Sequence, residues 1–85
     1  MTQITIKVQN ADTIRMSVAV TDLLINQPAL PATWLNAGDE RDNVKVYVDD
    51  NNLGRVSWSA QNTDGDNVAE GNLVVAANNT VYVIR

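Results

Sequence analysis

The chain contains neither cysteine nor histidine, and these absences exclude several kinds of site. Without cysteine there is no disulfide framework, zinc–thiolate centre or thiol nucleophile. Without histidine the commonest general base is also missing. The carboxylates are expected in turns, and a chain of 85 residues offers little water-excluding cleft around them. We therefore predict a protein that is not an enzyme, with no catalytic residue and no cofactor, apart from the calcium hypothesis considered below.

Basic residues and long apolar runs are also scarce. Six lysines and arginines stand against ten acidic residues, and the resulting net charge of −4 argues against a nucleic-acid partner. No apolar run approaches the roughly 20 residues that cross a bilayer, so no membrane partner is expected. The first residues lack the charged and apolar segments of a signal peptide. This predicts a cytoplasmic protein or part of a released assembly, unless a leader has been removed.

Phenylalanine is absent as well, and valine is the main candidate for the core. Apolar and polar residues alternate in short segments, the pattern of half-buried strands, and turns rich in Asn, Asp and Gly separate them. The clearest segments are 4–8, 14–20, 44–48, 56–60, 68–76 and 80–84. Six or seven short strands with no helical period predict an all-β fold. We expect one domain over residues 1–85, a small antiparallel β-sandwich of immunoglobulin-like or jelly-roll-like type.

The most regular stretch is Asn43–Gln61. It contains two apolar sets with a period of two, first Val44, Val46 and Val48, then Val56, Trp58 and Ala60. Pairing Val48 with Val56 would bring both sets to one face and leave a five-residue loop that ends in glycine. The stretch therefore predicts a β-hairpin, with Trp58 in the core rather than in a binding site.

Two other stretches constrain the arrangement of strands. If 4–8 and 14–20 paired as a hairpin, Lys7 would lie opposite Arg15, and like charges directly opposed are destabilising. These segments are therefore expected in different sheets; the alternative is an acidic partner on that face. Between Asp22 and Ala32, Pro28 and Pro31 exclude a central strand. That segment is expected to be a crossover between sheets or a short edge strand.

Polar loops supply two hypotheses about ligands. Trp34 lies outside any alternating pattern, so if either tryptophan is exposed, it is Trp34. With the loop residues Asp49, Asp50, Asn51 and Asn52 it would form a lectin-like site for a carbohydrate or protein ligand. Asn62, Asp64 and Asp66 have the alternate-residue oxygen spacing of a calcium loop. Ordinary turn chemistry explains the same three residues without a metal.

The C-terminal segments are apolar on both faces. If Leu73, Val75, Val81 and Val83 point inward, then Val74, Tyr82 and Ile84 point the other way. A strand pair of this kind is covered on both sides or exposes an apolar patch. We predict an interface at Val74, Tyr82 and Ile84 in a homo-oligomer, unless the segment 22–32 covers that face.

These observations lead to two functional hypotheses. The first is a non-enzymatic structural or interaction module that self-associates through its C-terminal strands, as a component of a larger assembly. The alternative is a lectin-like or calcium-dependent ligand-binding domain that uses its Asn- and Asp-rich loops.

Overall fold

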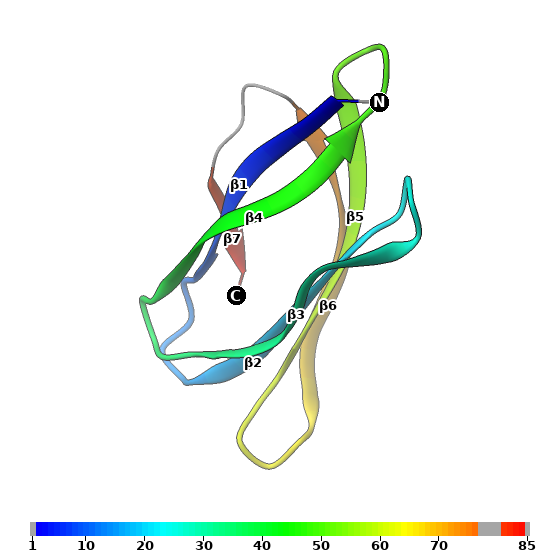
Figure 1. Ribbon diagram of the computed structural model, residues 1–85. Helices are drawn as coiled ribbons and strands as arrows, with labels where there is room; N and C mark the ends of the chain where they lie inside the picture. Colours follow the sequence, from blue (N-terminus) through cyan, green and yellow to red (C-terminus); the bar gives the residue numbers. More distant parts are fainter. Residues whose placement is uncertain (1, 77–80, 85) are drawn as a thin grey trace.

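The computed structural model describes residues 2–76 and, through their backbone, residues 81–84. The described residues form seven strands in two sheets (Figure 1). One sheet has the order β4-β1-β7 and the other the order β3-β2-β5-β6. The strands are β1 (Thr2–Asn10), β2 (Met16–Asp22), β3 (Gln27–Leu35), β4 (Glu40–Val48), β5 (Leu53–Gln61), β6 (Asn67–Ala76) and β7 (Val81–Ile84). The predicted all-β fold, a small β-sandwich, is confirmed.

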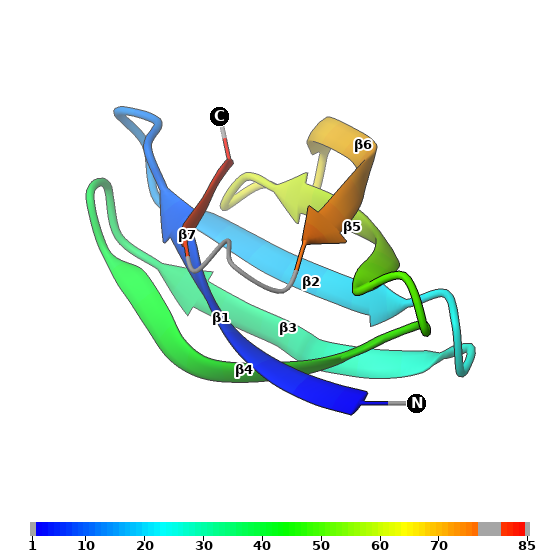
Figure 2. The ribbon, with the colours of Figure 1, turned by 90° about the horizontal axis from the view of Figure 1, so that it is seen from above.

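The first four strands form one long hairpin that bends from one sheet into the other. β1 and β2 make its outgoing arm, and β3 and β4 make its returning arm. β2 pairs with β3 beside the turn, and β1 pairs with β4 beyond the bend. Figure 2 shows the two linking loops side by side at the corner where both arms change layer. The expectation that segments 4–8 and 14–20 lie in different sheets is therefore confirmed, and Lys7 does not oppose Arg15.

The core lies between the two layers and consists largely of β-branched side chains that alternate along the strands. Full burial of one such side chain contributes about 1.5–3 kcal/mol. Valine suits this position because its branched Cβ packs well on a pleated surface. The buried apolar residues are Ile6, Val8, Met16, Val18, Val20, Leu30, Leu35, Val44, Val46, Val48, Val56, Ala60 and Val75.

Two buried polar residues connect the sheets at opposite ends of the sandwich. Asn10 ends β1 at the bend, where its Nδ2 donates to the carbonyl oxygens of Ile14 at 2.9 Å and Leu35 at 3.0 Å. Asp22 ends β2 at the other end, where its Oδ2 accepts the backbone N–H of Tyr47 at 2.8 Å. Both residues are at most 1% exposed. Buried polar groups are stable only when paired, so these bonds fix how the layers sit on each other.

The predicted hairpin over Asn43–Gln61 is wrong in its pairing. β4 and β5 belong to different sheets and face each other across the core, so Val48 does not pair with Val56. The connection is a tight corner in which the N–H of Asp49 donates to the carbonyl of Leu53 at 2.8 Å. A Cβ on Gly54 would lie 2.5 Å from the carbonyl oxygen of Tyr47, so the corner requires glycine. Alternation identifies an inward face, but it does not distinguish adjacent strands from opposed ones.

The two remaining expectations about strand order have different outcomes. Both prolines lie in β3, the edge strand of its sheet, so the edge position is confirmed and the crossover is wrong. The strand is not short as expected, because it runs for nine residues from Gln27 to Leu35. The C-terminal strands do not pair with each other as expected. β7 lies in the opposite sheet from β6, parallel to β1. No described segment forms a helix of the length and apolarity needed to cross a membrane.

Candidate functional site

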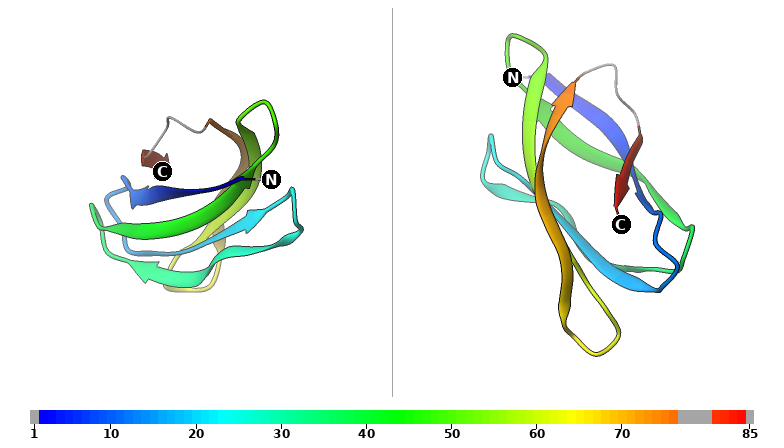
Figure 3. Two further views of the ribbon diagram at one scale, coloured as in Figure 1. Left: turned by 45° about the horizontal axis from the view of Figure 1, so that its top comes forward. Right: turned by 180° about the vertical axis from the view of Figure 1, so that it is seen from behind.

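β6 is the last strand of the four-stranded sheet, and β5 is its one described neighbour. Their pairing runs in regular register from Ala69 opposite Ala60 to Ala76 opposite Leu53, and it shifts at the Asn67 end. Figure 3 shows β6 at the outside of the sheet, with the turn of the β5–β6 hairpin projecting beyond the other strands. Within the part of the chain that the structure describes, the far side of β6 is a free edge.

The direction of the backbone groups along β6 follows from hydrogen bonds on its neighbours. The N–H of Leu23, just after β2, donates to the carbonyl of Arg55 at 2.8 Å, so Arg55 turns its backbone groups toward β2. In an antiparallel ladder, successive residues turn these groups to opposite sides. Val56 therefore faces β6, and its partner Leu73 faces β5. Asn72 and Val74, on either side of Leu73, present their backbone groups to the free edge.

The other edge strands carry features that discourage pairing. Edges are commonly protected by proline, by charged side chains or by short length. β3 contains two exposed prolines, and β7 is four residues long. β4 carries four exposed charged residues, Glu40, Arg41, Asp42 and Lys45. By contrast, the regular part of β6 from Ala69 to Ala76 contains no proline and one charged residue, Glu70.

The side chains of β6 alternate between the core and the solvent. Val75 is fully buried and Leu73 is partly buried against the core. Val74 points outward and is 57% exposed, the highest value among the exposed large apolar residues of the described chain. The free edge thus combines unpaired backbone groups with an exposed apolar side chain.

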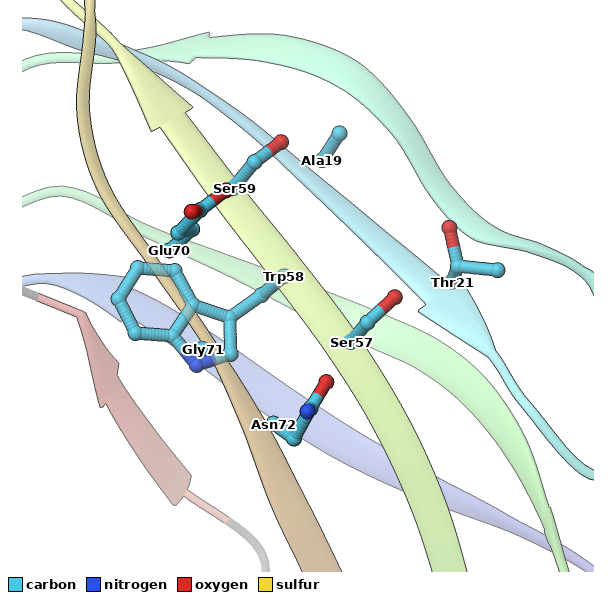
Figure 4. A pocket seen from close by; sticks show the side chains of 8 residues that line it. All are labelled: Ala19, Thr21, Ser57, Trp58, Ser59, Glu70, Gly71 and Asn72. Carbon is cyan, nitrogen blue, oxygen red and sulfur yellow. The ribbon is translucent and has the colours of Figure 1, made fainter.

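A shallow depression of about 430 Å³ lies beside this edge on the outer face of the sheet (Figure 4). Small side chains on three adjacent strands make this face shallow. The indole of Trp58 lies against Gly71 and is partly buried against the core, the side on which the sequence places it. The lining residues are Ala19, Thr21, Ser57, Trp58, Ser59, Glu70, Gly71 and Asn72. Their hydroxyl, amide and carboxylate groups offer hydrogen bonds to a polar ligand, so the lectin-like hypothesis stays a prediction.

The ligand site predicted from sequence is not assembled in one place. Trp34 is 46% exposed, which answers a question that the sequence left open, and the guanidinium carbon of Arg15 lies 4.8 Å from its ring centroid. Trp34 pairs with Ser17 on the neighbouring strand β2, and Ser17 pairs in turn with Gln61, the last residue of β5. Trp34 therefore lies beside the Gln61 end of β5. The loop with Asp49, Asp50, Asn51 and Asn52 leads into the other end of β5. At about 3.3 Å per residue, the nine residues of β5 separate them by roughly 26 Å.

The residues of the calcium hypothesis lie in the turn between β5 and β6. The Oδ1 of Asn62 accepts the backbone N–H groups of Asp64 and Asp66, both at 3.0 Å. Asn62 therefore stabilises the turn itself, while the other two side chains are exposed. Across residues 2–76, no three Asp, Glu, His or Cys side chains gather as a metal site would require. Calcium binding stays a prediction.

The interface predicted from sequence is described in part. Val74 is exposed at the free edge, whereas the side chains of Tyr82 and Ile84 lie outside the described residues. Sequence reasoning did not identify Asn72 and Glu70 as edge residues, because strand order was unknown. The signal available was the lack of proline and the single charge between Ala69 and Ala76.

Fold and site together define a class: a small, mostly antiparallel β-sandwich with one weakly protected edge among its described strands. No protein-family model matches the sequence, and no curated protein or solved structure is significantly similar to the chain.

Proposed function

We propose that this protein is a non-enzymatic structural module that self-associates through the free edge of β6. The observation that carries the proposal is the contrast between edges. Proline, charge or short length protects β3, β4 and β7, whereas Ala69–Ala76 has one charged residue and no proline. Strand addition to such an edge uses main-chain hydrogen bonds for affinity. A small domain also gains stability from association.

The expected association is moderate in strength. Pairing along one strand buries less surface than a standard interface of about 1,600 Å². We therefore expect dimers to form in the micromolar range or above, and to persist where a larger assembly raises the local concentration.

Sedimentation equilibrium from micromolar to millimolar concentration tests the proposal. The native chain should shift from monomer to a larger species as concentration rises. Val74→Lys should shift this equilibrium toward monomer by at least tenfold, because a charge at an edge opposes pairing. Its stability should change little, since Val74 is largely exposed.

Ile14→Lys is the matched control. Ile14 is 44% exposed and precedes β2, away from β6, so this variant should associate like the native chain. A native chain that remains monomeric at millimolar concentration would contradict the proposal, as would a Val74→Lys variant that associates normally.

A further inference from the structure

We infer that two copies pair antiparallel through β6 with Leu73 on the two-fold axis, and that this pairing closes at a dimer. The inference rests on the proposed function. A two-fold axis normal to the sheet pairs β6 with itself and keeps the inner faces of both sheets on the same side. Symmetric dimers of this isologous type are the commonest homo-oligomers.

The backbone limits the available registers. The regular part of the edge is Ala69–Ala76, and its residues with edge-facing groups are Glu70, Asn72, Val74 and Ala76. With the axis at Leu73, each Asn72 lies opposite Val74 of the second copy, and each Glu70 opposite Ala76. All four edge-facing residues are then used, and the pairing stays within the regular segment.

Neighbouring registers fit less well. With the axis at Asn72, each Glu70 carboxylate lies opposite Val74, the most exposed apolar side chain of the strand. An axis at Gly71 extends the pairing into the irregular end at Val68 and brings the two Glu70 side chains within two residues of each other. An axis at Val74 leaves fewer described residues of the two β6 strands paired with each other. The register at Leu73 places the Glu70 residues about 20 Å apart along the strands.

This register also explains why pairing would stop at two copies. The combined sheet has the order β3-β2-β5-β6-β6-β5-β2-β3, so a β3 strand lies at each end. Pro28 and Pro31 of each copy then protect both edges of the new sheet. A closed interface of this kind does not propagate into a fibre.

Cysteine cross-linking tests the register, and the native chain contains no cysteine to interfere. A residue on the two-fold axis lies opposite the same residue of the second copy. The backbone groups of Leu73 point toward β5, so the two Leu73 residues form a pair without direct hydrogen bonds. The Cα atoms of such a pair are about 4.5 Å apart, within reach of a disulfide bond. Under mild oxidation, Leu73→Cys should form a covalent dimer. Asn72→Cys and Val74→Cys should not link alone, because each is offset from its own copy by two residues.

A mixture of Asn72→Cys and Val74→Cys provides a second readout that does not alter the partly buried Leu73. These two exposed positions lie opposite each other across the interface, so the mixture should link although neither variant links alone. Val68→Lys, outside the pairing, should dimerise like the native chain.

The outcomes separate this inference from the proposed function. Linking of Asn72→Cys or Val74→Cys alone would overturn the register while leaving self-association intact. A dimer that links at none of these positions would overturn pairing through this strand. Growth beyond dimers in sedimentation would overturn the closure at two copies.

Discussion

β3 and β6 end the same four-stranded sheet, and they end it differently. β3 contains Pro28 and Pro31, and each proline removes a backbone donor from the strand. β6 keeps every backbone donor from Ala69 to Ala76 and exposes Val74. Both strands are long, with nine and ten residues, so length does not explain the difference. The comparison indicates that one end of the sheet is protected against pairing and the other remains available.

The largest expected effect comes from proline in β6. Leu73→Pro removes a donor that faces β5, which leaves a backbone acceptor of β5 unpaired, and it should lower the free energy of unfolding by about 1–3 kcal/mol. Asn72→Pro removes a donor that faces the free edge, so it should abolish the dimer at a much smaller cost in stability. Urea unfolding and sedimentation distinguish the two variants. Equal losses of stability would show that the backbone directions along β6 are misassigned.

A second prediction removes the protection from β3. The double variant Pro28→Thr and Pro31→Thr should give β3 a continuous set of donors and a second edge competent for pairing. We expect species larger than dimers, seen by light scattering at millimolar concentration, because both ends of the sheet then accept a strand. If the double variant still stops at dimers, the prolines do not account for the difference between the edges.

The smallest expected effect concerns packing beneath β6. A Cβ at Gly71 would lie 3.1 Å from the Nε1 of Trp58, so Gly71→Ala should shift the indole by a few tenths of an ångström. The stability cost should be about 1 kcal/mol or less, because overpacking is partly offset by reduced freedom of the unfolded chain. Fluorescence in a Trp34→Tyr background would report the shift of Trp58. Dimerisation should be unchanged, which separates side-chain packing from pairing at the edge.

The sequence was sufficient to predict most of the strands and their inward faces, but not the full length of β3 or the neighbours of each strand. Val44, Val46 and Val48 are buried as their alternation predicts, because the strand period follows directly from backbone geometry. The partner of β4 is β1, far away in the chain, and local alternation contains no information about that choice. The buried roles of Asn10 and Asp22 were also inaccessible, because Asn and Asp near strand ends usually indicate turns.

The candidate site was predictable to a similar extent. Val74 was identified from the excess of apolar residues near the C-terminus, which is a compositional signal. The free edge was not, because recognising it requires the order of strands in the sheet. The predicted ligand site combined Trp34 with Asp49–Asn52 because of their chemical type alone. In the structure these residues lie at opposite ends of β5.

The bent hairpin has a consequence for the order of folding. The turn at Leu23–Asn26 joins β2 and β3, so their contacts close the shortest loops and are the least costly to form first. The β1–β4 pairs lie further from that turn and follow once the corner around Asn10 has closed. β7 pairs with β1, which requires almost the whole chain to be in place. We therefore expect a slow folder on the millisecond-to-second scale, whose last step pairs β7 with β1.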